Sequence, residues 1–175
     1  IEHRTVWADG SVHWLDGSAT IFYDEQGQPL RMVGTSQPIG QRKQAEEALQ
    51  ASETRFQRIA DNVPGMLYQF QLYPDGSMRF PYISEGSHAI YGLEPHEIEA
   101  DATLVVNMIH PDDLAAFQQR VADSAATLED WEWEGRSLDT ASGTYKWVRG
   151  QSRPGRLPDD SVLWDGLLTD ITEQK

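Results

Sequence analysis

One stretch of sequence occurs twice in this chain and constrains its domain organisation more than any other feature. Residues 9–15 match residues 142–148, and residues 32–43 match residues 164–175. The offset is 133 residues for the first match and 132 for the second, so both share one frame with a single-residue gap. An internal repeat sets the domain count before any other pattern is interpreted. We therefore expect one complete module and only the C-terminal end of another.

The length of the chain agrees with one domain and a fragment. Its 175 residues are 39% hydrophobic, which is enough for an ordinary buried core. The sequence contains neither a signal peptide nor an apolar run of the roughly 18–20 residues that a membrane span needs. We expect a cytoplasmic location and no direct membrane insertion. Because the chain begins with Ile1 and not with Met, we also expect it to be part of a longer polypeptide.

Cysteine is absent from the sequence, and this absence excludes several kinds of chemistry. The chain cannot form disulfides or thiolate metal sites, and it cannot use a cysteine nucleophile. A chromophore attached through a cysteine is excluded for the same reason.

Negative charge is concentrated in one part of the chain. The net charge is −14, and residues 85–134 contain twelve acidic residues against a single base, Arg120. Such a field repels nucleic acids and anionic lipids, so we expect neither as a partner. A solvated acidic face accounts for the cluster without a dedicated cation site.

The first 62 residues predict a small sheet followed by a helix. We expect strands at residues 4–8, 11–21 and 30–37, because Asp9-Gly10 and residues 24–29 are turn sequences. From residue 41 to about 62 the pattern is helical, and its apolar seam follows heptad spacing. The seam consists of Ala45, Leu49, Ser52, Phe56, Ile59 and Val63. We expect Leu49, Phe56 and Ile59 to pair with a second copy of the chain, with packing on its own domain as the alternative.

The remaining sequence predicts an α+β domain. Two strands come first, then four helical segments, then three strands, and this order favours a five-stranded antiparallel sheet with helices packed on one face. The expected strands are residues 66–73, 78–84, 129–138, 144–153 and 162–171, and the expected helices are residues 85–91, 94–98, 103–108 and 111–126. Residues 1–40 correspond to the last three of these strands.

Four short motifs resemble the PAS sensory domain family, in the variety that ends with a PAC segment. The motifs are Ser52–Phe56, Ile109–Asp113, Gly143–Val148 and Asp165–Thr172. The resemblance covers residues 52–172 fully and residues 1–40 in part. It implies a preceding, truncated PAS domain at 1–40, a connecting signalling helix at 41–63, a complete PAS domain at 64–172 and the start of an outgoing helix at 173–175. The first copy departs from the pattern, because Pro38-Ile39-Gly40 stands in the place of Asp170-Ile171-Thr172.

The chemistry known for such domains can be compared with the residues present. Flavin sensors that form an adduct need a cysteine, which is missing here. A haem sensor needs an axial ligand, and the candidates are His88, His96 and His110. Asp112 and Asp113 beside His110 lack the spacing of a calcium loop and suit the N-terminus of a helix. We expect no bound cofactor, with haem or a flavin as alternatives, and no metal site.

No catalytic motif is present, so this segment is not expected to be an enzyme. The parent protein is expected to be a sensor histidine kinase or, second, a diguanylate cyclase. The resemblance implies a pocket between the sheet and the helices, and aromatic and apolar side chains predict its wall. The pocket candidates are Tyr68, Phe70, His88, Met108, Trp147 and Leu168. Trp131 and Trp133 alternate with acidic residues, and we expect them on the outer face of the sheet, at an interface.

The resemblance also implies how a signal leaves the domain. Asp170, Ile171 and Thr172 would couple the last strand to the outgoing helix. We expect a regulatory sensor module of a bacterial signalling protein that forms a homodimer, responds to a small-molecule ligand or a partner, and acts on an output domain of the same polypeptide. A ligand-free dimerisation spacer is the alternative. The three strands of residues 1–40 expose apolar side chains, and we expect them to be covered by the 41–62 helix or by another chain.

Overall fold

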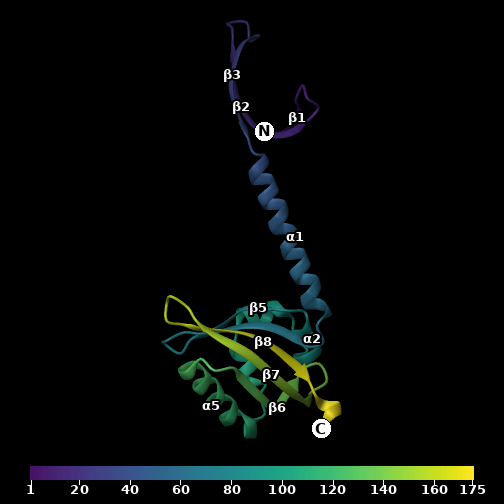
Figure 1. Ribbon diagram of the computed structural model, residues 1–175, viewed down its shortest axis with the longest axis vertical. Coiled ribbons are helices and arrows are strands. Elements are labelled where there is room, and N and C mark those ends of the chain that lie inside the picture. Colours follow the sequence, from purple (N-terminus) through teal and green to yellow (C-terminus); the bar gives the residue numbers. More distant parts are fainter. The chain divides into compact units, whose positions relative to one another are not determined.

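The computed structural model describes all residues from 1 to 175 and divides them into two compact units, Ile1–Phe56 and Gln57–Lys175. Each unit contains its own antiparallel sheet (Figure 1). Helix α1 (Gly40–Asn62) begins in the first unit and ends in the second. None of the helices combines the length and the apolar character that a bilayer crossing requires.

The first unit contains a three-stranded sheet with the order β1-β2-β3. Its strands are β1 (Glu2–Val6), β2 (Val12–Tyr23) and β3 (Pro29–Pro38). Gly10 and Gly27 turn the chain between them with φ angles of 85° and 76°, in the left-handed region that glycine adopts without strain. Asp9 Oδ1 stabilises the first turn, because it accepts a hydrogen bond from the backbone N–H of Ser11. The strands lie close to the predicted positions.

The apolar side chains of this small sheet remain exposed. Among them are Val6, Trp7, Ile21, Phe22, Leu30 and Met32. The prediction that the following helix covers these strands is therefore wrong. Only Ile39, at the junction between β3 and α1, is buried. Cover by another chain stays a prediction.

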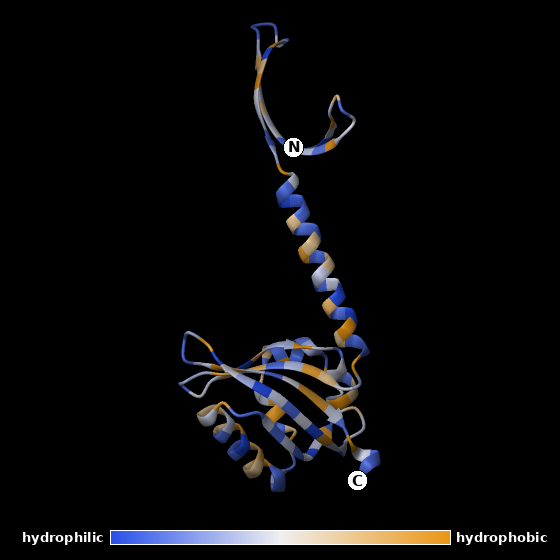
Figure 2. Cartoon of the chain, viewed as in Figure 1, coloured by the Kyte–Doolittle hydropathy of each residue, from blue (hydrophilic) through white to orange (hydrophobic).

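Helix α1 carries the predicted seam on an open surface. Leu49, Phe56 and Ile59 are all more than half exposed, whereas Ala60 near the end of the helix is buried. Apolar patches alternate with polar ones along the helix (Figure 2). Its many alanine, glutamate and glutamine residues favour the helix, and Arg42 pairs with Glu46 one turn later. Pairing of the seam with a second copy stays a prediction.

The second unit is an α+β domain with the strand order β5-β4-β8-β7-β6, which confirms the predicted fold class. Its strands are β4 (Met66–Leu72), β5 (Met78–Ile83), β6 (Trp131–Asp139), β7 (Thr144–Arg156) and β8 (Val162–Asp170). Its helices are α2 (Gly86–Tyr91), α3 (Pro95–Ala100), α4 (Thr103–Asn107), α5 (Pro111–Thr127) and the short 3-10 turn η1 (Thr172–Gln174). The helices lie on one face of the sheet, and the core fills the space between these two layers (Figure 1).

The ends of helix α5 are set by local sequence. Pro111 occupies the first turn, where its missing N–H costs nothing, and His110 Nδ1 accepts a hydrogen bond from the N–H of Asp112 at 3.2 Å. Leu128 closes the helix in a left-handed conformation with φ of 58°. The helix is anchored to the sheet by a buried bond, because Trp164 Nε1 donates to Ser124 Oγ at 2.9 Å. The predicted His-Pro-Asp-Asp helix start is thus explained by capping.

The two sheets share one register. Glu2 is paired with Asp16 across β1 and β2, and the residues at the matching positions of the repeat, Glu134 and Arg149, are paired across β6 and β7. The same holds one strand further on, where Leu15 pairs with Pro38 and Val148 pairs with Asp170. The sequence repeat is therefore also a repeat of strand pairing.

Candidate functional site

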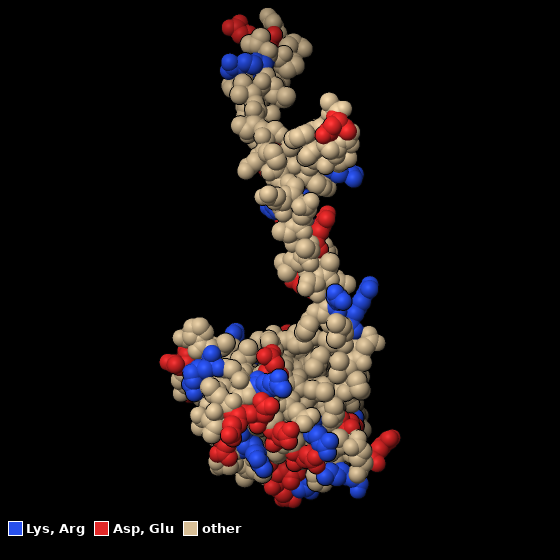
Figure 3. Space-filling view, viewed as in Figure 1, with Lys and Arg blue, Asp and Glu red and all other residues tan.

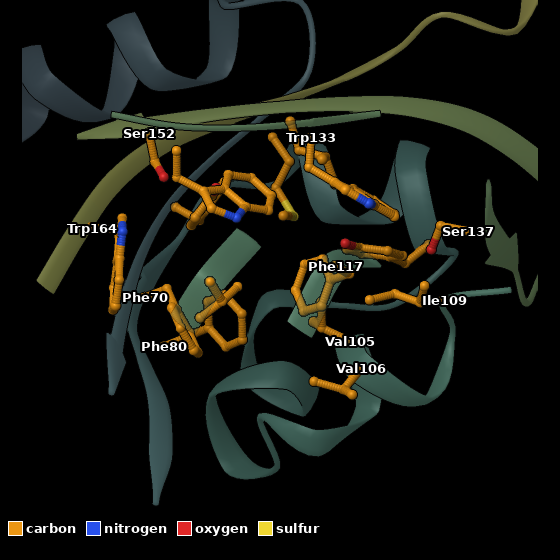
Figure 4. Close-up of a pocket in the computed structure, with 16 residues that line it drawn as sticks. Phe70, Phe80, Val105, Val106, Ile109, Phe117, Trp133, Ser137, Ser152 and Trp164 are labelled. Carbon is orange, nitrogen blue, oxygen red and sulfur yellow. The ribbon is translucent and has the colours of Figure 1, made fainter. Parts of the chain in front are cut away.

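An aromatic cavity lies between the sheet and the helices of the second unit (Figure 4). Its volume is about 60 Å³. Strand β4 contributes Met66, Tyr68 and Phe70 to the wall, and α5 contributes Phe117 and Val121 from the opposite side. Further wall residues come from β5, α2, α4, the following loop, β6, β7 and β8, and they are Phe80, Tyr91, Val105, Val106, Ile109, Trp131, Trp133, Ser137, Ser152, Trp164 and Leu168.

The two tryptophans of β6 lie inside and not on the outer face. Trp131 and Trp133 are only 6% and 7% exposed, and Phe117 packs edge-on against both rings at 5.7 and 5.1 Å between centroids. The prediction of an outward-facing aromatic interface is wrong. The alternation correctly separated two faces, but the helices cover the aromatic face and leave Glu132 and Glu134 toward solvent.

The structure separates the six predicted pocket residues. Tyr68, Phe70 and Leu168 line the cavity. Met108 is buried in the core near by, but it is not part of the cavity wall. For His88 and Trp147 the prediction is wrong.

His88 and Trp147 lie away from the cavity for simple geometric reasons. The His88 side chain is 65% exposed and lies 3.9 Å from Glu94, because the buried face of the short helix α2 is formed by its other residues. Trp147 precedes Val148, which is fully buried toward the helices, so the pleat of the strand turns Trp147 to the opposite face.

The polar groups of the cavity are few and neutral. Burial raises the pKa of Tyr68 to about 12, while a hydrogen bond with Ser152 partly offsets this rise. Burial likewise raises the pKa of Tyr91. The buried Trp131 Nε1 and Ser137 Oγ have no hydrogen-bond partner. A ligand that fits this wall would be uncharged and mainly apolar, with an acceptor for a buried donor.

Haem and a flavin do not fit this cavity. None of the five histidines is among the wall residues, so no imidazole faces the space where a haem iron would lie. The volume is also well below the roughly 300–1,000 Å³ that is usual for cofactor and drug-sized ligands. His110 is committed to the cap of α5 and packs edge-on against Tyr145 at 4.7 Å.

The acidic start of α5 is an ion pair and not a cation site. Asp113 accepts hydrogen bonds from Arg136 Nε and Nη2, both at 2.9 Å, and this arginine holds the pKa of the Asp113 carboxyl below its ordinary value. Asp112 lies 3.3 Å from the same guanidinium. On the surface of the second unit, acidic groups are interspersed with Lys and Arg (Figure 3). Sequence reasoning missed this pair, because nothing local indicates that β6 passes beside the helix start.

The three predicted coupling residues form one junction at the end of β8. Asp170 Oδ1 accepts a hydrogen bond from the N–H of Thr172 at 2.8 Å, and Thr172 Oγ1 accepts one from the N–H of Trp147 at 3.0 Å. Ile171 is 3% exposed, and its N–H donates to the carbonyl of Trp147 at 2.8 Å. The junction thus ties the residues after β8 to β7, two residues beyond the cavity residue Leu168.

Comparison with known proteins agrees with this architecture. A family model described as the PAS fold matches residues 1–36 and 80–165, which together exceed half of the chain. The chain is 29% identical over its whole length to an uncharacterized protein, y4lL, of Sinorhizobium fredii, and covers 20% of that protein. It is 27% identical over 85% of its length to the two-component sensor PprA of Pseudomonas aeruginosa, and covers 16% of it.

A solved PAS domain shows the same fold. The PAS domain of an HTR-like protein from Haloarcula marismortui superposes with a TM-score of 0.54 at 18% identity, over 74% of this chain and 99% of that domain. The chain spans at most about a fifth of the length of the curated relatives it matches. The family match, the strand order and the position of the cavity lead to one assignment. The chain belongs to the PAS fold family.

Proposed function

We propose that this chain is a regulatory sensor module that passes a change in its cavity to an output domain of the same polypeptide. The carrying observation is that one strand serves both parts of the site. Leu168 of β8 lines the cavity, and Asp170 of the same strand ties the outgoing residues to β7. A ligand that shifts β8 relative to β7 would therefore act directly on the junction.

The surrounding protein is proposed to be a cytoplasmic sensor histidine kinase, with a diguanylate cyclase as the second choice. The similarity to a two-component sensor supports the first choice. In this proposal residues 1–40 are the C-terminal strands of a preceding PAS domain, and their shared register with β6, β7 and β8 supports that assignment. Helix α1 would then connect two sensor modules, and its exposed seam would pair with a second copy.

The ligand is proposed to be a small, neutral and mainly apolar molecule. The cavity wall is almost entirely aromatic or aliphatic, so a charged ligand would lose its hydration without gaining a counter-ion. We expect phenol to bind the purified protein more tightly than benzene by roughly three- to tenfold, because its oxygen can accept a hydrogen bond from Trp131 Nε1. Isothermal titration with each compound measures the difference.

A matched pair of variants shows whether such binding occurs in the cavity. Val121→Phe places a larger side chain in the cavity wall and should weaken phenol binding at least tenfold. Ala116→Phe adds the same ring on the exposed side of the same helix and should leave binding unchanged. If the wild-type protein binds neither compound and native mass spectrometry finds no co-purified molecule, the sensing proposal fails and the ligand-free dimerisation spacer is favoured.

Transmission through the junction is tested separately from binding. Asp170→Ala removes the acceptor for the Thr172 N–H while leaving every cavity residue in place. We expect phenol to change the amide hydrogen exchange of residues 170–174 in the wild type but not in this variant, with phenol affinity retained within about twofold. Equal exchange responses in the two proteins would show that Asp170 does not couple the cavity to the outgoing segment.

A further inference from the structure

The residues that leave the first sheet are attached to its outer face by a lysine. Lys43, in the first turn of α1, lies 2.6 Å from the carboxylate of Glu2 on β1. The same ammonium lies 5.4 Å from the centre of the Trp14 ring on β2. Lys43 holds the pKa of Glu2 far below its ordinary value, to about 2, with help from Arg42. One cation thus bridges two strands of the sheet and the helix that follows it.

The second sheet repeats this arrangement with different residues. Lys175, just after β8 and η1, lies 2.8 Å from the carboxylate of Glu134 on β6. Its ammonium lies 5.1 Å from the centre of the Trp147 ring on β7. Lys175 is also the main cause of the lowered pKa of Glu134, followed by Arg149. The same three kinds of group meet at both exits.

The shared strand register makes these two sets equivalent and not merely similar. Glu2 and Glu134 hold the same pairing position in their sheets, and Lys43 and Lys175 are related by the same offset of 132 residues as the repeat. The other cation beside each glutamate is not shared. It is Arg42 from the outgoing helix in the first copy and Arg149 from a neighbouring strand in the second. The lysine, glutamate and tryptophan are the common element.

We infer that Lys43 and Lys175 are positioning residues, each of which latches the segment leaving a PAS sheet onto the outer face of that sheet. We call the two groups the first latch (Glu2, Trp14 and Lys43) and the second latch (Glu134, Trp147 and Lys175). An ion pair and a cation–π contact are individually weak on a surface, but here both act on one ammonium. Together they fix where the outgoing segment begins relative to two strands.

The two exits differ in what accompanies the latch. In the second copy Asp170 and Thr172 add side-chain hydrogen bonds at the junction. In the first copy Pro38 and Gly40 occupy these positions and have no side chain that could make them. Both copies keep the central backbone bond, from Ile39 N–H to the Trp14 carbonyl and from its counterpart in the second copy. The first latch therefore carries a larger share of the attachment than the second.

The second latch is also connected to the cavity wall. The Arg136 guanidinium lies 5.7 Å from the centre of the Trp147 ring and donates to Asp113 at the start of α5. Phe117, one turn further along α5, lines the cavity. Arg4 repeats the first of these contacts, at 5.7 Å from the Trp14 ring. A shift of α5 would thus reach Lys175 through Arg136 and Trp147. The part of this inference that concerns signalling rests on the proposed function, whereas the positioning role does not.

The first latch is tested by removing the charge of Lys43 alone. Lys43→Met keeps the apolar stem and should speed hydrogen exchange of the amides in the first turn of α1 by roughly three- to tenfold, the combined effect of one exposed ion pair and one cation–π contact. The N–H of residue 43 itself reports this opening, because it is bonded to the carbonyl of Ile39. Lys43→Arg keeps both contacts and should exchange within about twofold of the wild type.

The second latch is tested by nuclear magnetic resonance order parameters, since it lies at the end of the chain. We expect Lys175→Met and Glu134→Gln each to lower the backbone order parameters of residues 172–174 toward about 0.6, the flexible range. Arg153→Met is the matched control, because it removes an exposed cation from the same sheet that pairs with Asp130 and not with the outgoing segment. It should leave these order parameters unchanged.

The readouts separate positioning from general stability. A lysine that merely stabilised the fold would speed exchange throughout its unit and lower the thermal midpoint, whereas a latch changes only the outgoing residues. Unchanged exchange in Lys43→Met together with unchanged order parameters in Lys175→Met would overturn the inference. A local change in both, in a protein that binds no phenol, would keep the latches and reject the sensing proposal.

Discussion

Replacing Trp164 by alanine is expected to lower the free energy of unfolding of the second unit by about 4 kcal/mol, in the range usual for removing a buried tryptophan. Trp164 is 2% exposed and packs against Phe70 with ring centres 5.4 Å apart. Its Nε1 donates to Ser124 Oγ, which in turn donates to the carbonyl of Glu129 at 2.7 Å. The substitution therefore removes ring packing and the bond that anchors α5 to the sheet. Urea unfolding followed by circular dichroism measures the change.

Two further variants divide this effect into its parts. Trp164→Phe keeps most of the packing and loses the hydrogen bond to Ser124, so we expect a loss of about 1–2 kcal/mol. Trp147→Ala removes a tryptophan from the outer face of the sheet, where no cavity forms, and should cost less than Trp164→Ala. If Trp164→Ala and Trp147→Ala were equally destabilising, Trp164 would not be the anchor of the two layers.

Replacing Gly86 by alanine is expected to destabilise the second unit by about 3 kcal/mol, at the upper end of ordinary overpacking effects. A Cβ atom at this position would overlap the carbonyl oxygen of Gly65 and lie 2.9 Å from Met66 Cα. Both obstacles are backbone atoms, which cannot rotate away as a flexible side chain could. The start of α2 would have to move away from the start of β4, where the cavity residue Met66 lies. Chemical denaturation with an unchanged m-value is the expected signature.

A second glycine provides the matched control for this change. Gly155 lies in β7 of the same unit, and a Cβ atom there would have its nearest neighbour, the Leu163 carbonyl oxygen, at 4.0 Å. Gly155→Ala should therefore be neutral or stabilise by roughly 0.5 kcal/mol, because alanine restricts the unfolded chain. A large loss of stability in both variants would mean that steric overlap is not the cause of the Gly86 effect.

The elements of the second unit follow closely from the sequence, and the faces of the sheet do not. The predicted strand at 144–153 is extended in the structure to Arg156, and the other boundaries differ by only a few residues. Alternation in β6 separated Trp131 and Trp133 from their acidic neighbours. It did not say which set would be covered, because a strand has the same period whichever face the helices pack against. The same limit placed Trp147 in the cavity by mistake.

The first unit shows a different limit. Its strands and turns were predictable because Asp9-Gly10 and Gly27 are local signals of chain reversal. Whether the resulting sheet is covered depends on contacts with distant residues. The helix that follows leaves most of the apolar side chains of these strands exposed, so the local pattern of strand and helix did not decide their packing.

The sequence by itself determined the repeat, the order of the elements, the family resemblance and the exclusion of cysteine chemistry. These follow from local backbone preferences and from composition, which act over a few residues. Only the tertiary structure decided which face of β6 and β7 lines the cavity, that His88 lies outside it, and that Arg136 binds Asp113. It also brought Lys43 to Glu2 and Lys175 to Glu134. These contacts join residues far apart in the chain, and their pairing depends on strand order and on the side that the helices cover.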